Sequence, residues 1–480
     1  MNLQSFLLMR HELVLIAITL IVLIAELATS DSRKSIIAPL ALCLFAVHTI
    51  IGFLPMEYGS LFGGMFNSTP INGMVKNILN IGVLIVLLQA QKMFDSEINR
   101  GKVSEYFIVL FSTLIGMFYM VSAGDFLMFY IGLEIATIPL AALAAFNRGE
   151  NKSAEAGIKL LLSSALSSGV LLYGLSMLYA ANGSLFFDAL IHGNYEITHL
   201  HTLALIFFFA GMAFKLSLVP FHLWAADVYE GAPVNVTSYL SVISKGAAAF
   251  IFTVVLYTVF HNYADKWQPM MYIIAILTMI VGNLFALRQN NLKRFLAFSS
   301  IAQAGFLLLG IISGTAMGMA TVVYYILVYV FSNLAAFGVI SIIEMHTGKT
   351  TISDLNGMYR TNPKLSLALM LALFSLAGIP PVAGFFGKFF LFTAAASVGT
   401  TANYILVLIA LLNTIISLYY YLMPVKAMFI NKNDSPIAYF KSDVYAKIGL
   451  AISLTGMVVV GFASPIFENI LAACFGIVGL

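Results

Sequence analysis

Five lysines lie inside long apolar stretches of the sequence, at Lys76, Lys159, Lys215, Lys245 and Lys388. An ammonium group at the middle of a bilayer costs at least ~2.5–3.5 kcal/mol, and it is tolerated where it faces a partner or a water-filled cavity. A lysine in such a place shifts its pKa readily, so it can bind and release protons. These residues therefore indicate proton or ion translocation.

The five lysines differ in depth. Lys215 and Lys245 lie near the centres of their apolar stretches, where a side chain cannot reach water easily. Lys76 and Lys159 lie about one to two turns from the expected helix ends, where a long side chain can extend to the interface. We therefore prefer this snorkelling interpretation for Lys76, and for Lys159 we weigh it equally with a functional role.

Glu134 is the carboxylate at comparable depth and the natural counter-charge for a buried lysine. A nearby carboxylate raises a lysine pKa and desolvation lowers it, so a carboxylate that moves away drives the lysine to release its proton. The alternative is a structural ion pair, which apolar packing could replace at little cost. The pair is thus expected to act as a switch.

The bilayer must supply the solvent for the elements that hold these residues. The chain has 480 residues, of which 61% are hydrophobic and only 9% charged. Apolar runs recur from end to end, and each crossing needs about 20 residues. The sequence predicts an all-α polytopic membrane protein of about fourteen transmembrane helices.

Prolines break two of the expected helices beside a lysine. Pro220 follows Lys215 by about one turn, and Pro380 and Pro381 precede Lys388 within a glycine-rich segment. Broken helices that carry a charge at the break are typical of ion sites in membrane proteins. The two breaks lie five helices apart, and an odd offset places them in opposite orientations, as in inverted-repeat transporters.

Basic residues in the loops predict the topology. The positive-inside rule places the basic loops in the cytoplasm, so both termini are expected on the periplasmic side. One inward loop carries Asp227 and Glu230 without a basic residue and is a possible proton-collecting surface. The outward loops carry only Arg10 and Lys266, whereas the inward loops carry Arg33, Lys34, Lys92, Arg100, Lys102, Arg148, Lys152, Arg288, Lys293, Arg294, Lys349, Arg360, Lys364, Lys426, Lys432, Lys441 and Lys447.

The sequence contains no pattern that is typical of a redox centre or a nucleotide-binding site. Cys43 and Cys474 are far apart, and the eight histidines form no ligand-like pair. Such spacing does not fit an iron–sulfur or zinc site. The glycine-rich phosphate-binding patterns are also absent from the sequence. No cofactor is therefore expected on this chain.

The segment FKLSLVPFHLWAADVYEGAPVNVTSYLSVISK, residues 214–245, closely resembles the antiporter-like membrane subunits of respiratory complex I, the proton-pumping NADH:quinone oxidoreductase, and among them the subunit N group. Supporting segments are GLEIATIPLAAL around Glu134, NLKRFLAFSSIAQAGF from Asn291 and LAGIPPVAGFFGKF ending at Phe389. The resemblance implies a single antiporter-like domain over residues 1–480. It also implies two inverted five-helix repeats, at about 104–262 and 269–430, with flanking helices at both ends.

The resemblance also implies roles. Glu134 and Lys215 form the coupled pair, Lys245 is the central relay, and Lys388 is the terminal site on the exit path. Lys159 and His222 match positions often included in the route, and Gln303 stands where many relatives have histidine. Glutamine cannot titrate, so a relay through Gln303, Ser299 and Ser300 must use water.

The surroundings implied are those of a bacterial inner-membrane complex. Partners are other membrane-arm subunits, including further antiporter-like ones. NADH, FMN, iron–sulfur clusters and quinone belong to other subunits. Two alternatives remain open on the sequence: a subunit of a multi-subunit cation/proton antiporter, which shares the buried lysines, and a membrane scaffold whose charges are structural.

Overall fold

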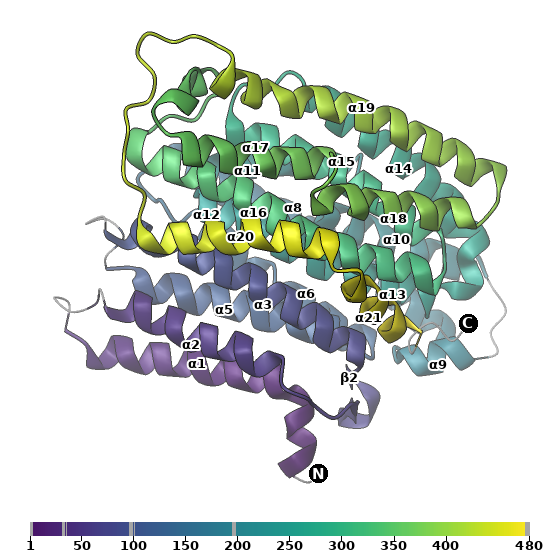
Figure 1. Ribbon diagram of the computed structural model, residues 1–480. Coiled ribbons are helices and arrows are strands. Elements are labelled where there is room, and N and C mark those ends of the chain that lie inside the picture. The colour runs from purple at the N-terminus through teal and green to yellow at the C-terminus, as the bar shows by residue number, and fades with distance from the viewer. Residues whose placement is uncertain are drawn as a thin grey trace.

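The computed structural model describes residues 3–30, 34, 36–95, 99, 101–193 and 198–475. Arg33 and Arg100 of the predicted inward loops lie outside the described residues. Long apolar helices run side by side through the molecule, with α1 and α2 at one edge and α19 at the other (Figure 1). α1 begins and α21 ends at the same end of this array.

The first part of the chain folds into two helices, a small hairpin and two further helices. A short helix η1 precedes α1, and the hairpin joins α2 to α3. The elements are η1 (Leu3–Met9), α1 (Arg10–Ala28), α2 (Ile37–Gly52), β1 (Gly59–Leu61), η3 (Phe62–Gly64), β2 (Phe66–Ser68), α3 (Pro70–Ala90), η4 (Gln91–Asp95) and α5 (Val103–Val121).

The middle of the chain holds most of the interrupted helices. Its elements are α6 (Phe126–Ile135), α7 (Ile138–Ala144), α8 (Asn151–Asn182), α9 (Phe187–His192), α10 (His199–Leu216), α11 (Leu223–Gly231), α12 (Val234–Tyr239), a π-helical turn η5 (Leu240–Ser244), α13 (Lys245–Tyr257), η6 (His261–Tyr263) and α14 (Ala264–Ala286).

The last part of the chain packs around the longest helices. Its elements are α15 (Leu292–Ile312), α16 (Ala316–Thr347), η7 (Ser353–Leu355), η8 (Met358–Arg360), α17 (Pro363–Ala377), α18 (Ala383–Ser397), α19 (Thr401–Phe429), α20 (Val444–Phe462) and α21 (Ser464–Cys474). α16 is central to this part, because it contacts α3, α15, α17, α18, α20 and α21.

The predicted helical membrane fold is confirmed. Among the described residues, twelve helical segments are long and apolar enough to cross a membrane. Three shorter apolar helices are α2, α17 and α18. The two other predicted crossings fall on α2 and on the α17–α18 pair. The exact number of fourteen and the division into two inverted repeats stay predictions.

The hairpin is a feature that the sequence analysis did not include. β1 pairs antiparallel with β2, and Gly59 lies opposite Ser68. Gly63 and Gly64 in the connecting turn have φ angles of 67° and 99°, which glycine adopts without steric cost. The Asn67 N–H then donates to the Ser122 carbonyl at 2.7 Å. The hairpin is thereby attached to the end of α5.

Both predicted helix breaks are confirmed. α10 ends at Leu216, where Ser217 adopts a left-handed conformation (φ 58°), and Pro220 has no N–H to continue the helix. α17 ends at Ala377, where Gly378 has a φ of 89°. The two breaks place Lys215 in the last turn of α10 and Lys388 in the second turn of α18.

Two further interruptions lie beside candidate residues. Helix α6 stops at Ile135, directly after Glu134, and α7 starts at Ile138 with Pro139 in its first turn. Pro139 cannot donate the hydrogen bond that would join the two helices. The π-helical turn η5 ends at Ser244, directly before Lys245. Such turns are frequent at functional sites.

Candidate functional site

Three buried lysines extend from helix interruptions into the centre of the bundle. Lys215, Lys245 and Lys388 have exposed fractions of 7%, 7% and 4%. All three stand in or next to a broken or distorted turn, where backbone groups are free to bind a charge or a water. Lys215 and Lys245 are therefore buried rather than snorkelling, as their central positions in the apolar stretches predict.

Lys215 and Glu134 lie near each other but are not in direct contact. The Lys215 ammonium donates to the Thr137 hydroxyl at 2.6 Å. Glu134 forms none of the ion pairs found among the described residues, and its Oε1 is buried without a hydrogen-bond partner there. Its charge still acts on Lys215. Thr137, and not Glu134, therefore holds the ammonium in this structure.

A small cavity of about 10 Å³ adjoins Lys215. Thr137 lines it from the α6–α7 break, and Leu240 and Ser244 line it from the π-helical turn. A cavity needs about 10–15 Å³ to hold one water. One water at this place would lie between Lys215 and the residue that directly precedes Lys245.

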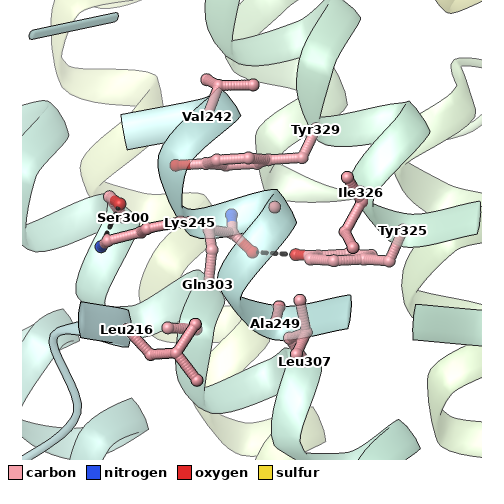
Figure 2. A pocket seen from close by; sticks show the side chains of 12 residues that line it. Leu216, Val242, Lys245, Ala249, Ser300, Gln303, Leu307, Tyr325, Ile326 and Tyr329 are labelled. Atoms are coloured by element: carbon pink, nitrogen blue, oxygen red, sulfur yellow. Dashed lines mark hydrogen bonds between the residues drawn. The ribbon is translucent and has the colours of Figure 1, made fainter. Parts of the chain in front are cut away.

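Lys245 is held between α15 and an aromatic face. Its ammonium donates to the Ser300 hydroxyl at 2.7 Å, and it lies 5.6 Å from the ring centroid of Tyr229. Figure 2 shows this bond together with the side chains that surround the adjoining cavity. The cavity has a volume of about 30 Å³, enough for one or two waters.

Gln303 connects the surroundings of Lys245 with those of Lys388. Its amide donates to the Leu376 carbonyl at 2.9 Å and to the Tyr421 hydroxyl at 2.9 Å. Its carbonyl oxygen accepts from the Tyr325 hydroxyl (Figure 2). Tyr421 also bonds to Ser299 at 2.5 Å. Gln303 is therefore the centre of a buried polar network.

The Lys245 cavity and a smaller one beside Lys388 share three wall residues. The smaller cavity measures about 10 Å³, and Gln303, Tyr325 and Tyr329 line both. The hydroxyl of Tyr329 lies 3.3 Å from that of Ser241 in the π-helical turn. The two cavities thus share a wall that includes the polar side chains of Gln303, Tyr325 and Tyr329.

Lys388 is anchored at the end of α17. Its ammonium donates to the Ala377 carbonyl at 3.0 Å, and it lies 4.6 Å from the ring centroid of Phe306. The C-terminal carbonyls of a helix attract a cation. Gly384 permits the close approach of α17 and α18, because a Cβ there would lie 1.7 Å from the Ser375 carbonyl oxygen.

Lys159 and His222 lie apart from Lys215, Lys245 and Lys388, the three residues that we call the lysine row. Lys159 is 41% exposed and pairs with Glu155 and Asp227, each at 2.6 Å. His222 is buried at the start of α11, and its Nδ1 has no hydrogen-bond partner among the described residues. The structure does not bring either side chain into the three cavities described above.

The predicted proton-collecting carboxylates are ion-paired. Arg294 donates to Asp227 at 2.8 Å and to Glu230 at 3.1 Å, and Lys152 pairs with Glu230 at 2.9 Å. Burial raises the pKa of Asp227, but hydrogen bonds from Lys159 and Arg294 outweigh it and hold the pKa below its usual value. Asp227 and Glu230 lie on helix α11 rather than in a loop, and with Lys152, Lys159 and Arg294 they form a network of charges.

The snorkelling interpretation of Lys76 is wrong. Lys76 is 2% exposed and pairs with Glu12, which is 0% exposed, at 2.5 Å. Glu12 is 64 residues earlier in the chain, and no local pattern revealed that α1 carries the partner. The Glu12–Lys76 pair is therefore a second set of buried charges, in addition to Lys215, Lys245 and Lys388.

Comparison with known proteins identifies the family. Residues 123–417 match the family described as NADH:quinone oxidoreductase/Mrp antiporter, TM. A protein of Phocaeicola vulgatus named NADH-quinone oxidoreductase subunit N is 50% identical, with 98% of each chain covered. The chain belongs to this family. A protein of the same name from Azobacteroides pseudotrichonymphae is 49% identical over 99% of each chain, so the match is to the subunit N group at full length.

Solved structures agree with this assignment. A chain of respiratory complex I from Thermus thermophilus superposes with a TM-score of 0.78 at 28% identity, over 94% of this chain and 96% of the other. A chain of the Mrp complex from Dietzia superposes with a TM-score of 0.84 at 18% identity, over 100% and 98% of the two chains. The second likeness is one of fold alone. Among the described residues no cluster of three or more histidine, cysteine, aspartate or glutamate side chains could hold a metal ion.

Proposed function

We propose that this chain translocates protons as the subunit N of a membrane-bound NADH-quinone oxidoreductase, using Glu134 and the lysine row Lys215, Lys245 and Lys388. The single observation that carries the proposal is that a small cavity adjoins each of the three buried lysines, and that the cavities of Lys245 and Lys388 share three wall residues. The full-length relatives named NADH-quinone oxidoreductase subunit N support the energy source. Electron transfer takes place on other subunits, which hold NADH, FMN, iron–sulfur clusters and quinone.

The first step of the proposed mechanism is charge separation at the broken helix α6–α7. When Glu134 approaches Lys215, it stabilises the charged ammonium; when it moves away, desolvation favours the neutral amine. The bond of Lys215 to Thr137, with Oε1 of Glu134 lacking a hydrogen-bond partner among the described residues, supports assigning this arrangement to the separated state. In this state Lys215 is ready to pass its proton on.

Water and hydroxyl groups carry the proton onward. From Lys215 it passes through the small cavity lined by Ser244 to Lys245, which Ser300 holds at 2.7 Å. From Lys245 it crosses the wall formed by Gln303, Tyr325 and Tyr329 to Lys388. Gln303 does not titrate, so its role is to hold water and the tyrosine hydroxyls in line.

Lys159 and His222 have a less direct place in this proposal. Lys159 belongs to the charged network of Asp227 and Glu230 at the end that the positive-inside rule places in the cytoplasm. We assign it to proton entry because the next residue of its helix, Leu160, lines the Lys215 cavity. His222 lies six residues after Leu216 in the same break. Both would act at entry, not along the row.

The proposal also covers orientation and partners. It places the chain in the bacterial inner membrane with both termini in the periplasm, beside other membrane-arm subunits including antiporter-like ones. In support of this orientation, α1 begins and α21 ends at the same end of the bundle (Figure 1). The competing antiporter hypothesis is supported by the fold shared with the Mrp complex and by the family description, which includes Mrp antiporters, whereas the full-length relatives are named subunit N.

The test is NADH-driven proton pumping by the assembled complex carrying Glu134→Gln or Lys215→Ala. Both substitutions are expected to reduce pumping at least about tenfold, because each removes one charge of the switch. The control is Lys447→Ala, which removes an exposed lysine. If assembled Glu134→Gln and Lys215→Ala complexes pump like the control, the proposal is wrong. Sodium-driven proton exchange without NADH would favour the antiporter hypothesis instead.

A further inference from the structure

A compact polar cluster lies between α1, α2, α3 and α5, apart from the lysine row. Glu12 and Lys76 form its ion pair, and the rings of His11 and His48 lie 6.1 Å apart beside them. Phe118 packs against both imidazoles, at 6.0 and 6.3 Å. All four polar side chains are at most 2% exposed. Four titratable groups are therefore buried together in an apolar part of the bundle.

The hydrogen bonding of this cluster is incomplete. Oε2 of Glu12, both ring nitrogens of His48 and both amide atoms of Asn80 are buried without a hydrogen-bond partner among the described residues. Asn80 lies next to His48. Buried polar atoms are normally satisfied by protein or by ordered water. The unpaired atoms on three helices thus point to bound water, and with it to a route for protons.

One residue connects the cluster with the surface. Asn77 Oδ1 lies 3.1 Å from His11 Nε2 and accepts a hydrogen bond from it when that nitrogen carries the proton. Asn77 also lines a groove of about 570 Å³ between the α2–α3 segment and α20–α21. A Cβ on Gly52 would lie 2.3 Å from Asn77 Oδ1 and 3.1 Å from His11 Nε2. The absence of a side chain at Gly52 makes this contact possible.

An apolar layer separates the cluster from the row. One turn beyond Lys76, Leu79 packs against Gly246, and Gly82 packs against Ile243. These contacts hold α3 against the segment that carries Lys245 without a polar side chain between them. On this side of the cluster the contacts with the Lys245 segment are apolar, whereas Asn77 gives it a polar contact toward the groove.

We propose that His11, Glu12, His48 and Lys76 form a second protonatable site, which exchanges protons and water with the groove through Asn77 and is independent of the lysine row. The transferred species is a proton, taken from groove water onto an imidazole or the Glu12 carboxylate and returned to it. Arg10 on α1 and Tyr119 on α5 are the other charged or titratable groups that face the cluster.

The positions of the charges explain why protons bind there. An ion pair taken out of water is costly, and attraction compensates for this only if the remaining lone pairs are satisfied. Oε2 of Glu12 lacks such a partner, so a water or a proton donor beside it would complete the hydrogen bonding of the pair. A purely structural pair, by contrast, would tie α1 to α3 and keep the same charges at every pH.

The experiment is infrared difference spectroscopy of the assembled complex in lipid, titrated between about pH 4 and about pH 9. The spectrum of the unsubstituted complex minus that of Glu12→Gln should contain one band of a protonated carboxyl group, which grows as the pH falls. His48→Gln should shift the pH midpoint at which this band appears. His261→Gln is the control, because His261 is exposed. If no such band titrates, or if His48→Gln and His261→Gln leave it equally unchanged, the site does not exist as proposed.

Two further variants test the route and the independence of the site. Asn77→Leu should slow deuterium exchange of the carboxyl at least about tenfold; an unchanged rate contradicts access through Asn77. Lys245→Ala, which should stop pumping if the row is functional, should leave the Glu12 band in place. Loss of the band in Lys245→Ala would overturn the independence, whereas loss of pumping with the band retained supports both proposals.

Discussion

Replacing Gln303 by leucine should disconnect the Lys245 cavity from the Lys388 cavity. The amide makes three buried hydrogen bonds. Tyr421 keeps its bond to Ser299 in the variant, so the Tyr325 hydroxyl and the Leu376 carbonyl are the groups left unsatisfied. At about 1–3 kcal/mol for each such group, the penalty is about 2–6 kcal/mol. If only the lower value, about 2 kcal/mol, adds to the transfer barrier, proton passage slows about thirtyfold.

The assay for Gln303→Leu is the number of protons taken up per NADH oxidised by the complex reconstituted in vesicles. Gln89→Leu is the matched control, because Gln89 is 2% exposed against 3% for Gln303, and its amide donates to the Leu334 carbonyl without lining any of the three lysine cavities. Gln303→His should retain pumping, since imidazole restores both hydrogen bonding and titration. A Gln303→Leu complex that pumps as well as the Gln89→Leu complex would refute the connection through Gln303.

Three other predictions follow from buried contacts. Gly384→Val should prevent assembly or lower the Tm strongly, because a Cβ there lies 1.7 Å from a backbone oxygen; a normal Tm would contradict the packing. Lys76→Met should destabilise the chain by about 3–5 kcal/mol because Glu12 is left buried and unpaired, and Glu12→Gln added to it should restore most of the loss in denaturant unfolding. The pKa of Asp227 is lower in the folded chain than in the unfolded chain, so its ionised carboxylate stabilises the fold above about pH 4. This stabilisation is lost as the pH falls further and the carboxylate is protonated. The Tm difference between the unsubstituted chain and Asp227→Asn should therefore shrink below about pH 4, and a constant difference would count against the ion pairs.

The sequence was sufficient to predict the helical membrane fold and both broken helices, because these depend on local chemistry. Apolar runs of crossing length require helices, and Pro220 and Pro380 cannot continue one. The π-helical turn before Lys245 and the β1–β2 hairpin were not predicted. Both depend on contacts with distant segments, such as the bond from Asn67 to Ser122, which periodicity does not contain.

The candidate site was predicted unevenly for the same reason. Depth in the apolar runs was enough to single out Lys215, Lys245 and Lys388, whose burial is an average property of their helices. Lys76 was misjudged, because distance from a helix end says nothing about Glu12 on a neighbouring helix. The bond of Lys215 to Thr137 was also missed, because Thr137 becomes available only through the break between α6 and α7.

The central claim is that protons pass through the buried lysine row. Its most direct measurement is the ratio of protons translocated to NADH oxidised in vesicles that contain the assembled complex with Lys245→Ala. Lys245 is the lysine between the other two cavities, so its loss should reduce the ratio or abolish coupled turnover, while assembly and bound cofactors of the other subunits remain normal. An assembled Lys245→Ala complex with the full ratio and full turnover would contradict the account.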